Sequence, residues 1–175
     1  MPSVNLAMPH ARILIIGVLG AALSAFSAPV RADRSVLELF LGQWNVRVRT
    51  LQPAPAELTY VETYGWVLDR KFIRGETRQK SDGTSDVVFA TYDEQQKGYP
   101  FWIFSSTGSY SYLAPGKWDA GRRTLEWVNP PGWDVTYVAR CMFPDRKSRD
   151  CSLLIKDWKG RVLLEQEIRA VRCGE

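Results

Sequence analysis

The chain has 175 residues, a formal net charge of +4 and a single histidine, His10; this length suffices for one domain with its own core. Because His10 lies in a predicted export signal, we expect a mature protein without histidine, which excludes catalytic triads and metal or haem sites that need imidazole. Basic and acidic residues are interspersed along the chain, which argues against a nucleic-acid partner.

The first segment has the order of a secretion signal. An apolar run over residues 13–26 follows Arg12, and a short polar stretch ends at Ala32 with small side chains where a signal peptidase cuts. We expect residues 1–32 to be removed after Ala32, which leaves a periplasmic or secreted domain of residues 33–175. The apolar run is shorter than the roughly 20 residues that span a bilayer, so no stable membrane insertion is expected after cleavage.

A short helix is expected over residues 36–41, capped by Ser35 and ended by Gly42. Beyond it the hydrophobic pattern alternates at every second residue, and turn signals recur at roughly ten-residue intervals, as in a β-sandwich or barrel. The pattern predicts ten strands, over residues 43–51, 57–68, 71–80, 86–92, 99–106, 110–118, 123–128, 134–143, 150–158 and 161–172.

Every connection between these strands is short. Short connections favour an up-and-down order, and such a sheet loses its exposed edges most fully by closing on itself. We therefore predict an all-β fold, a single antiparallel up-and-down barrel of about ten strands with a short N-terminal helix. A sandwich is the other possibility, but its Greek-key connections would have to be longer.

Two features resemble the calycin superfamily, which includes lipocalins and fatty-acid-binding proteins. Gly42 and Trp44 form a Gly-x-Trp that leads into the first strand, and Arg169 and Arg172 lie on the last. In calycins a last-strand arginine packs against this tryptophan and closes the barrel floor. Because the alternation places Arg172 on the apolar face, the resemblance implies that Trp44 and Arg172 are structural partners.

Further motifs resemble a bacterial family of lipocalin-like domains of unknown function. The Tyr-Asp turn, aromatic strand and Gly-x-Trp-Asp hairpin of that family correspond to residues 90–93, 101–104 and 116–119. The resemblance covers residues 37–172 and implies a cup that can hold an apolar molecule, with no activity attached to it. Haem binding of the nitrobindin kind is not expected, because the iron-ligating histidine of those barrels has no counterpart here. We expect no cofactor.

Cys141 and Cys151 lie on consecutive predicted strands, and a register centred on Arg146 places them opposite each other on one face. Cross-strand neighbours approach to about 4.5 Å between Cα atoms, and an oxidising compartment preserves a disulfide. We expect a disulfide here, with two reduced, buried thiols as the other interpretation. Three cysteines are too few for a tetrahedral sulfur site, so no metal is expected. Cys173 would stay free or bridge to a second chain, and the oligomeric state stays open.

The second and third strands each carry a row of charged and aromatic side chains: Tyr60, Glu62, Tyr64 and Trp66 on one, and Phe72, Arg74, Glu76 and Arg78 on the other. If both rows faced the lumen, carboxylates, phenols and guanidiniums would converge in an apolar cup able to hold a ligand carboxylate. This hypothesis assigns ligand binding to Glu62, Tyr64, Arg74, Glu76 and Arg78. The other interpretation is a solvated outer face with weak cross-strand ion pairs.

Three functions follow. We favour an extracytoplasmic protein that binds a small apolar, aromatic or amphipathic molecule without catalysis, because the chain is rich in aromatic residues and has no reactive triad. The second is a cofactor-free lyase or isomerase, with Glu62 or Glu76 as the acid-base group and an arginine of the third strand holding a substrate carboxylate. The third is an envelope structural or assembly partner without a ligand.

Overall fold

The computed structural model describes residues 34–174. It confirms the ten predicted strands, whose ends shift by two residues or fewer. The expected export signal, residues 1–32, lies outside the described residues. In order, the elements are α1 (Ser35–Glu38), β1 (Gly42–Gln52), β2 (Ala56–Val67), β3 (Phe72–Arg78), β4 (Asp86–Thr91), β5 (Tyr99–Ser105), β6 (Tyr110–Asp119), β7 (Thr124–Val128), β8 (Val135–Met142), β9 (Ser148–Asp157) and β10 (Val162–Arg172).

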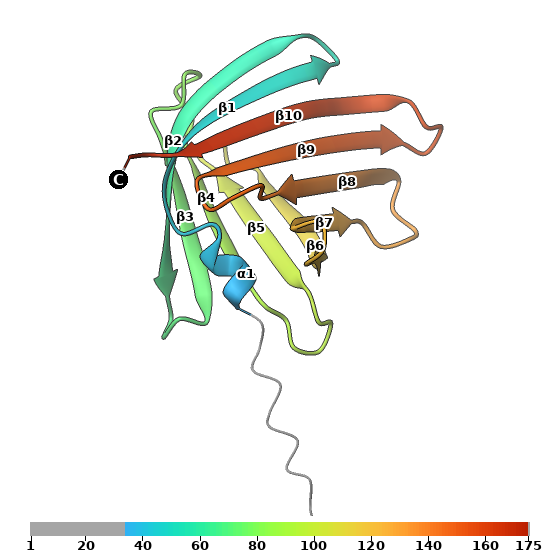
Figure 1. The fold of residues 1–175 in the computed structure, drawn as a ribbon. Helices are drawn as coiled ribbons and strands as arrows, with labels where there is room; N and C mark the ends of the chain where they lie inside the picture. Colours follow the sequence, from blue (N-terminus) through green and yellow to red (C-terminus); the bar gives the residue numbers. More distant parts are fainter. Residues whose placement is uncertain (1–33, 175) are drawn as a thin grey trace, which may run out of the picture. The chain divides into compact units, whose positions relative to one another are not determined.

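The strands form a closed antiparallel barrel, in which each strand pairs with its neighbours in the chain and β10 returns to β1 (Figure 1). In the closing ladder Trp44 lies opposite Arg172 and Val46 opposite Ala170. Closure pairs the first strand, β1, with the last, β10, as the short connections predicted. The predicted up-and-down barrel is confirmed, and the sandwich is excluded. Within residues 34–174, no helix is long and apolar enough to cross a membrane.

One end of the barrel is covered by α1 and the turn after it; we call this end the floor. Leu37 and Phe40 belong to the same buried core as Trp44, and the Phe40 ring lies 5.0 Å from Phe143 and 5.3 Å from Phe101, between ring centroids. The expectation that Ser35 caps the helix is wrong, because the helix begins at Ser35 and Arg34 occupies the N-cap position.

The helix is also shorter than predicted, because the chain tightens after Glu38. Backbone N–H groups of Leu39, Phe40 and Leu41 donate to carbonyls three residues earlier, the pattern of 3₁₀ turns at a helix end. Gly42 then enters β1 at φ +94°, and a Cβ at this position would lie 2.7 Å from Nη1 of Arg172. The positive φ favours glycine there, and the absence of a Cβ leaves room for the Arg172 guanidinium.

The wall is incomplete between β6 and β7. Their ladder contains only three pairs, from Lys117↔Glu126 to Asp119↔Thr124, so the first half of β6 has no partner on β7. Side chains complete the wall there: the Tyr137 hydroxyl accepts from the backbone N–H of Ala114 at 2.8 Å, and Nε1 of Trp127 donates to the carbonyl of Tyr99 at 2.7 Å. This stretch lies toward the end of the barrel opposite the floor, which we call the mouth.

Candidate binding site in the barrel lumen

The barrel encloses a cavity of about 570 Å³, which we call the lumen. Its walls come from most of the strands and are mainly aromatic and aliphatic, with Phe101, Trp127, Ile103, Leu153 and Ile155 among them. Tyr110 and Trp133 border it at the mouth, where their side chains are largely exposed. This volume lies in the range of small-molecule pockets, and walls of this kind suit an apolar guest.

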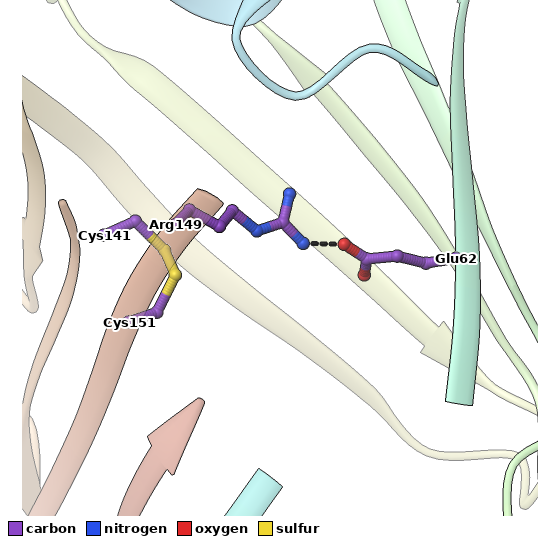
Figure 2. The surroundings of a disulfide bond; sticks show 4 residues. All are labelled: Glu62, Cys141, Arg149 and Cys151. Carbon is purple, nitrogen blue, oxygen red and sulfur yellow. Dashed lines mark ion pairs between the residues drawn. A yellow bond between two sulfur atoms is a disulfide. The ribbon is translucent and has the colours of Figure 1, made fainter. Parts of the chain in front are cut away.

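The lumen ends at the floor in a buried ion pair between Glu62 of β2 and Arg149 of β9 (Figure 2). Both side chains are only 5% exposed. The Arg149 guanidinium also lies over three aromatic rings, at 4.9 Å from Trp44, 5.2 Å from Phe40 and 5.6 Å from Tyr64. Pairing and cation–π contacts together offset the cost of burying the charge.

Arg149 keeps spare hydrogen-bonding capacity. Its Nε and Nη1 atoms are buried and have no hydrogen-bond partner within residues 34–174. Burial lowers the pKa of Arg149 to about 10, an effect that the charge of Arg172 reinforces and Tyr60 opposes. The guanidinium therefore stays protonated at neutral pH, with N–H donors to offer.

Trp44 connects the ion pair of Glu62 and Arg149 to β10, the strand that closes the barrel. Arg172 lies over the Trp44 ring at 4.5 Å, so the expected contact between these two residues is present. The indole Nε1 donates to the carbonyl of Phe40 at 2.7 Å, and Nε of Arg172 donates to the carbonyl of Arg146 at 2.9 Å. Trp44 thus has guanidinium contacts from both β9 and β10, which makes the floor a tightly connected assembly.

Two tyrosines of β2 complete the polar end of the lumen. Burial raises the pKa of Tyr60, and it raises the pKa of Tyr64 well above its usual range, helped by Tyr60 and Asp86. Both phenols are therefore protonated at neutral pH and suit hydrogen bonding rather than proton abstraction. Tyr64 packs closely against the glycine opposite it, since a Cβ on Gly75 would lie 2.3 Å from Cε1 of the ring.

The charged row of the third strand lies outside the barrel. On β3 the buried residues are Ile73, Gly75 and Thr77, so the alternation turns the opposite face to solvent. There Glu76 pairs with Arg74 at 2.6 Å and with Arg78 at 3.4 Å. The hypothesis that Arg74, Glu76 and Arg78 line the lumen is wrong, whereas Glu62 and Tyr64 do line it.

The structure contains the predicted disulfide between Cys141 of β8 and Cys151 of β9. The two residues are direct cross-strand partners, with Cα atoms 4.0 Å apart, and both border the lumen. Arg149 precedes Cys151 by two residues and shares its face, so the disulfide lies beside the ion pair (Figure 2). Cys173 is a free thiol.

Arg149 is not among the predicted site residues, because the predicted ninth strand begins at residue 150, whereas β9 begins at Ser148. A signal was available: if Cys151 faces inward, strand alternation turns Arg149 inward as well. Among residues 34–174 no three His, Cys, Asp or Glu side chains gather as a metal site.

Comparisons with known proteins identify the fold. No protein-family model matches the sequence, and no curated protein does. The crystal structure of Rv2717c from M. tuberculosis superposes with a TM-score of 0.59 at 15% identity, over 81% of this chain and 97% of the other. The S-type phycobiliprotein lyase CPES from Guillardia theta gives a TM-score of 0.51 at 15% identity, over 82% and 94%. These likenesses concern the fold alone, which is a lipocalin-like β-barrel.

Proposed function

We propose that this protein binds a small apolar or amphipathic molecule in its lumen. The observation that carries the proposal is the cavity of about 570 Å³, whose walls are mainly aromatic and aliphatic and whose floor holds the buried ion pair of Glu62 and Arg149. Sites for small molecules have this composition, in which apolar walls supply affinity and a few polar groups fix orientation.

The likeness to a phycobiliprotein lyase concerns the fold, and we propose no catalytic role. The acid-base hypothesis needed Glu62 or Glu76 in one lumen with an arginine of β3. Glu76 and both arginines lie outside, and the carboxylate of Glu62 is already paired with Arg149.

We also propose that the protein acts outside the cytoplasm. Disulfides persist in oxidising compartments, and the Cys141–Cys151 pair forms one. The charged, apolar and small-residue order of the first 32 residues supports the same location.

Two neighbouring leucines of β9 provide a matched test of lumen binding. Leu153 borders the lumen, whereas Leu154 alternates to the outer face. A Leu153→Trp substitution should fill part of the cavity, and Leu154→Trp should leave it open. Trp127 and Trp133 border the lumen and report its occupancy by fluorescence.

The experiment titrates the protein with dodecanoate, 1-dodecanol and 4-phenylphenol. We expect saturable quenching in the wild type and in Leu154→Trp, and at least about tenfold weaker binding in Leu153→Trp, since an overfilled cavity cannot accept the guest. Failure of all three probes to bind, or equal binding by the two variants, would contradict lumen binding. The first of these results would favour a structural partner without a ligand.

A further inference from the structure

We propose that the ligand is a monocarboxylate with an apolar body, whose carboxylate binds Arg149 at the floor of the lumen. The inference rests on the proposed function and specifies the chemistry of the guest. Arginine carries five N–H donors and no acceptor. Glu62 contacts Arg149 through one nitrogen, Nη2, while Nε and Nη1 have no partner among the described residues. A buried donor without a partner is costly, and an acceptor on the ligand would remove that cost.

The charges of the floor favour an anion. Two guanidiniums, those of Arg149 and Arg172, contact Trp44. Only one carboxylate, that of Glu62, faces them, because no acid within residues 34–174 forms an ion pair with Arg172. The floor therefore carries one excess positive charge, that of Arg172, which is partly buried and reaches the lumen only through Trp44 and Arg149.

The charged groups beside Tyr60, which are Lys80 and Asp86, do not alter this count. Lys80 lies 5.7 Å from the Tyr60 ring and pairs with Asp86 at 2.8 Å, so these two charges cancel. A monoanion would neutralise the floor, whereas a phosphate dianion would leave a buried negative charge. A carboxylate is the monoanion whose geometry matches a guanidinium.

The rest of the lumen defines the remainder of the guest. From the floor to the mouth its lining is dominated by rings and aliphatic side chains, such as Phe101, Trp127 and Leu153. A ligand whose carboxylate reaches Arg149 must place its body along these walls. The body is therefore apolar, and its far end lies near Tyr110 and Trp133 at the mouth.

The test compares dodecanoate with 1-dodecanol, which share a chain and differ in the headgroup. At about pH 7.5 the acid is ionised. We expect the wild type to bind dodecanoate at least about tenfold more tightly than 1-dodecanol, the size of a charge-assisted hydrogen bond. Arg149→Gln should abolish this preference.

A second variant should change affinity in the opposite direction. Glu62→Gln removes the carboxylate that competes for Arg149, so dodecanoate should bind several-fold more tightly while 1-dodecanol is unaffected. Arg149→Gln leaves Glu62 unpaired and is at risk of unfolding, so the double variant Glu62→Gln/Arg149→Gln, which buries no unpaired charge, replaces it if circular dichroism shows loss of structure. A purely structural role for the ion pair would move the affinities for both probes together.

The results separate this inference from the proposed function. If both probes bind, and Leu153→Trp excludes both, but the wild type does not prefer the acid, the carboxylate inference is overturned and lumen binding stands. A preference for the acid that survives replacement of Arg149 also overturns it. If neither probe binds the wild type, lumen binding and the inference fall together.

Discussion

At the scale of single residues, the ion pair between Glu62 and Arg149 dominates the energetics of the floor. Both charges are withdrawn from water, and removing one partner from such a pair leaves the other unpaired. We expect Arg149→Met to lower the free energy of unfolding by about 3–5 kcal/mol, and Glu62→Leu/Arg149→Met to lower it much less. Urea unfolding measures both.

An exposed pair of the outer wall serves as the control. Arg140 and Glu126 are 57% and 41% exposed, and Arg140→Met should lower the free energy of unfolding by less than about 1 kcal/mol. If Arg149→Met lowered the free energy of unfolding by as little as Arg140→Met does, the stability of the floor would not depend on its buried charges.

Gly75 leaves room for the Tyr64 ring because it has no side chain. A Cβ there would lie 2.3 Å from the Tyr64 ring, whereas a Cβ on Gly65 would meet nothing within 4 Å. Gly75→Ala should displace Tyr64 and cost about 1–3 kcal/mol in unfolding free energy, as overpacking does. Gly65→Ala is the matched control and should be neutral or slightly stabilising. Thermal unfolding of both variants tests this prediction. Equal melting temperatures would contradict the close packing of Tyr64 against Gly75.

At the scale of elements, the disulfide ties β8 to β9 across a sequence separation of 10 residues. Closing a loop of that length contributes about 2–3 kcal/mol to stability. We expect Cys141→Ala/Cys151→Ala to lose about this amount and Cys173→Ala to lose little. In denaturant, thiol titration should find one free thiol before reduction and three after it. Three thiols before reduction would exclude the bond.

Several hairpin turns depend on an aspartate that accepts backbone N–H groups. Asp93 accepts from Gln95 and Gln96, and Asp145 from Lys147 and Ser148, at 2.7–2.9 Å. Hydrogen bonds from Gln96 hold the pKa of Asp93 below its usual value, and those from Lys147 and Ser148 do so for Asp145.

A pKa that is lower in the folded state means that the folded form binds fewer protons. The stability from these turns is therefore fully present above the unfolded pKa of about 4 and is lost as the pH falls through the lower folded values. Urea unfolding between about pH 5 and pH 2 should show stability falling with acid, and falling less steeply in Asp145→Asn. Identical slopes in the two proteins would contradict this role of the turn.

At the scale of the whole molecule, local patterns were enough to predict the barrel. Alternation and turn residues act over a few positions, so they marked the ten strands, and the short connections left closure as the way to satisfy the edges. The disulfide between Cys141 and Cys151 could also be predicted from a local pattern, because it depends only on the register of one hairpin.

The features that the sequence left open depend on contacts between distant segments. Alternation alone does not predict which face of β3 points into the barrel. The face that carries Gly75 points inward, and the Tyr64 ring occupies the space over this glycine. The partner of Glu62 comes from β9, far along the chain. The gap between β6 and β7 likewise reflects how strands of unequal length pair, which no local motif records.

The most direct test of the account is a crystal structure grown with 12-bromododecanoic acid and recorded at the bromine absorption edge. We predict one anomalous peak inside the barrel near Trp133 and Tyr110, with the carboxylate at Arg149 and the chain along Phe101 and Leu153. A lumen filled by its own side chains, or bromine bound only on the outer surface, would contradict the claim that this barrel is a binding cup.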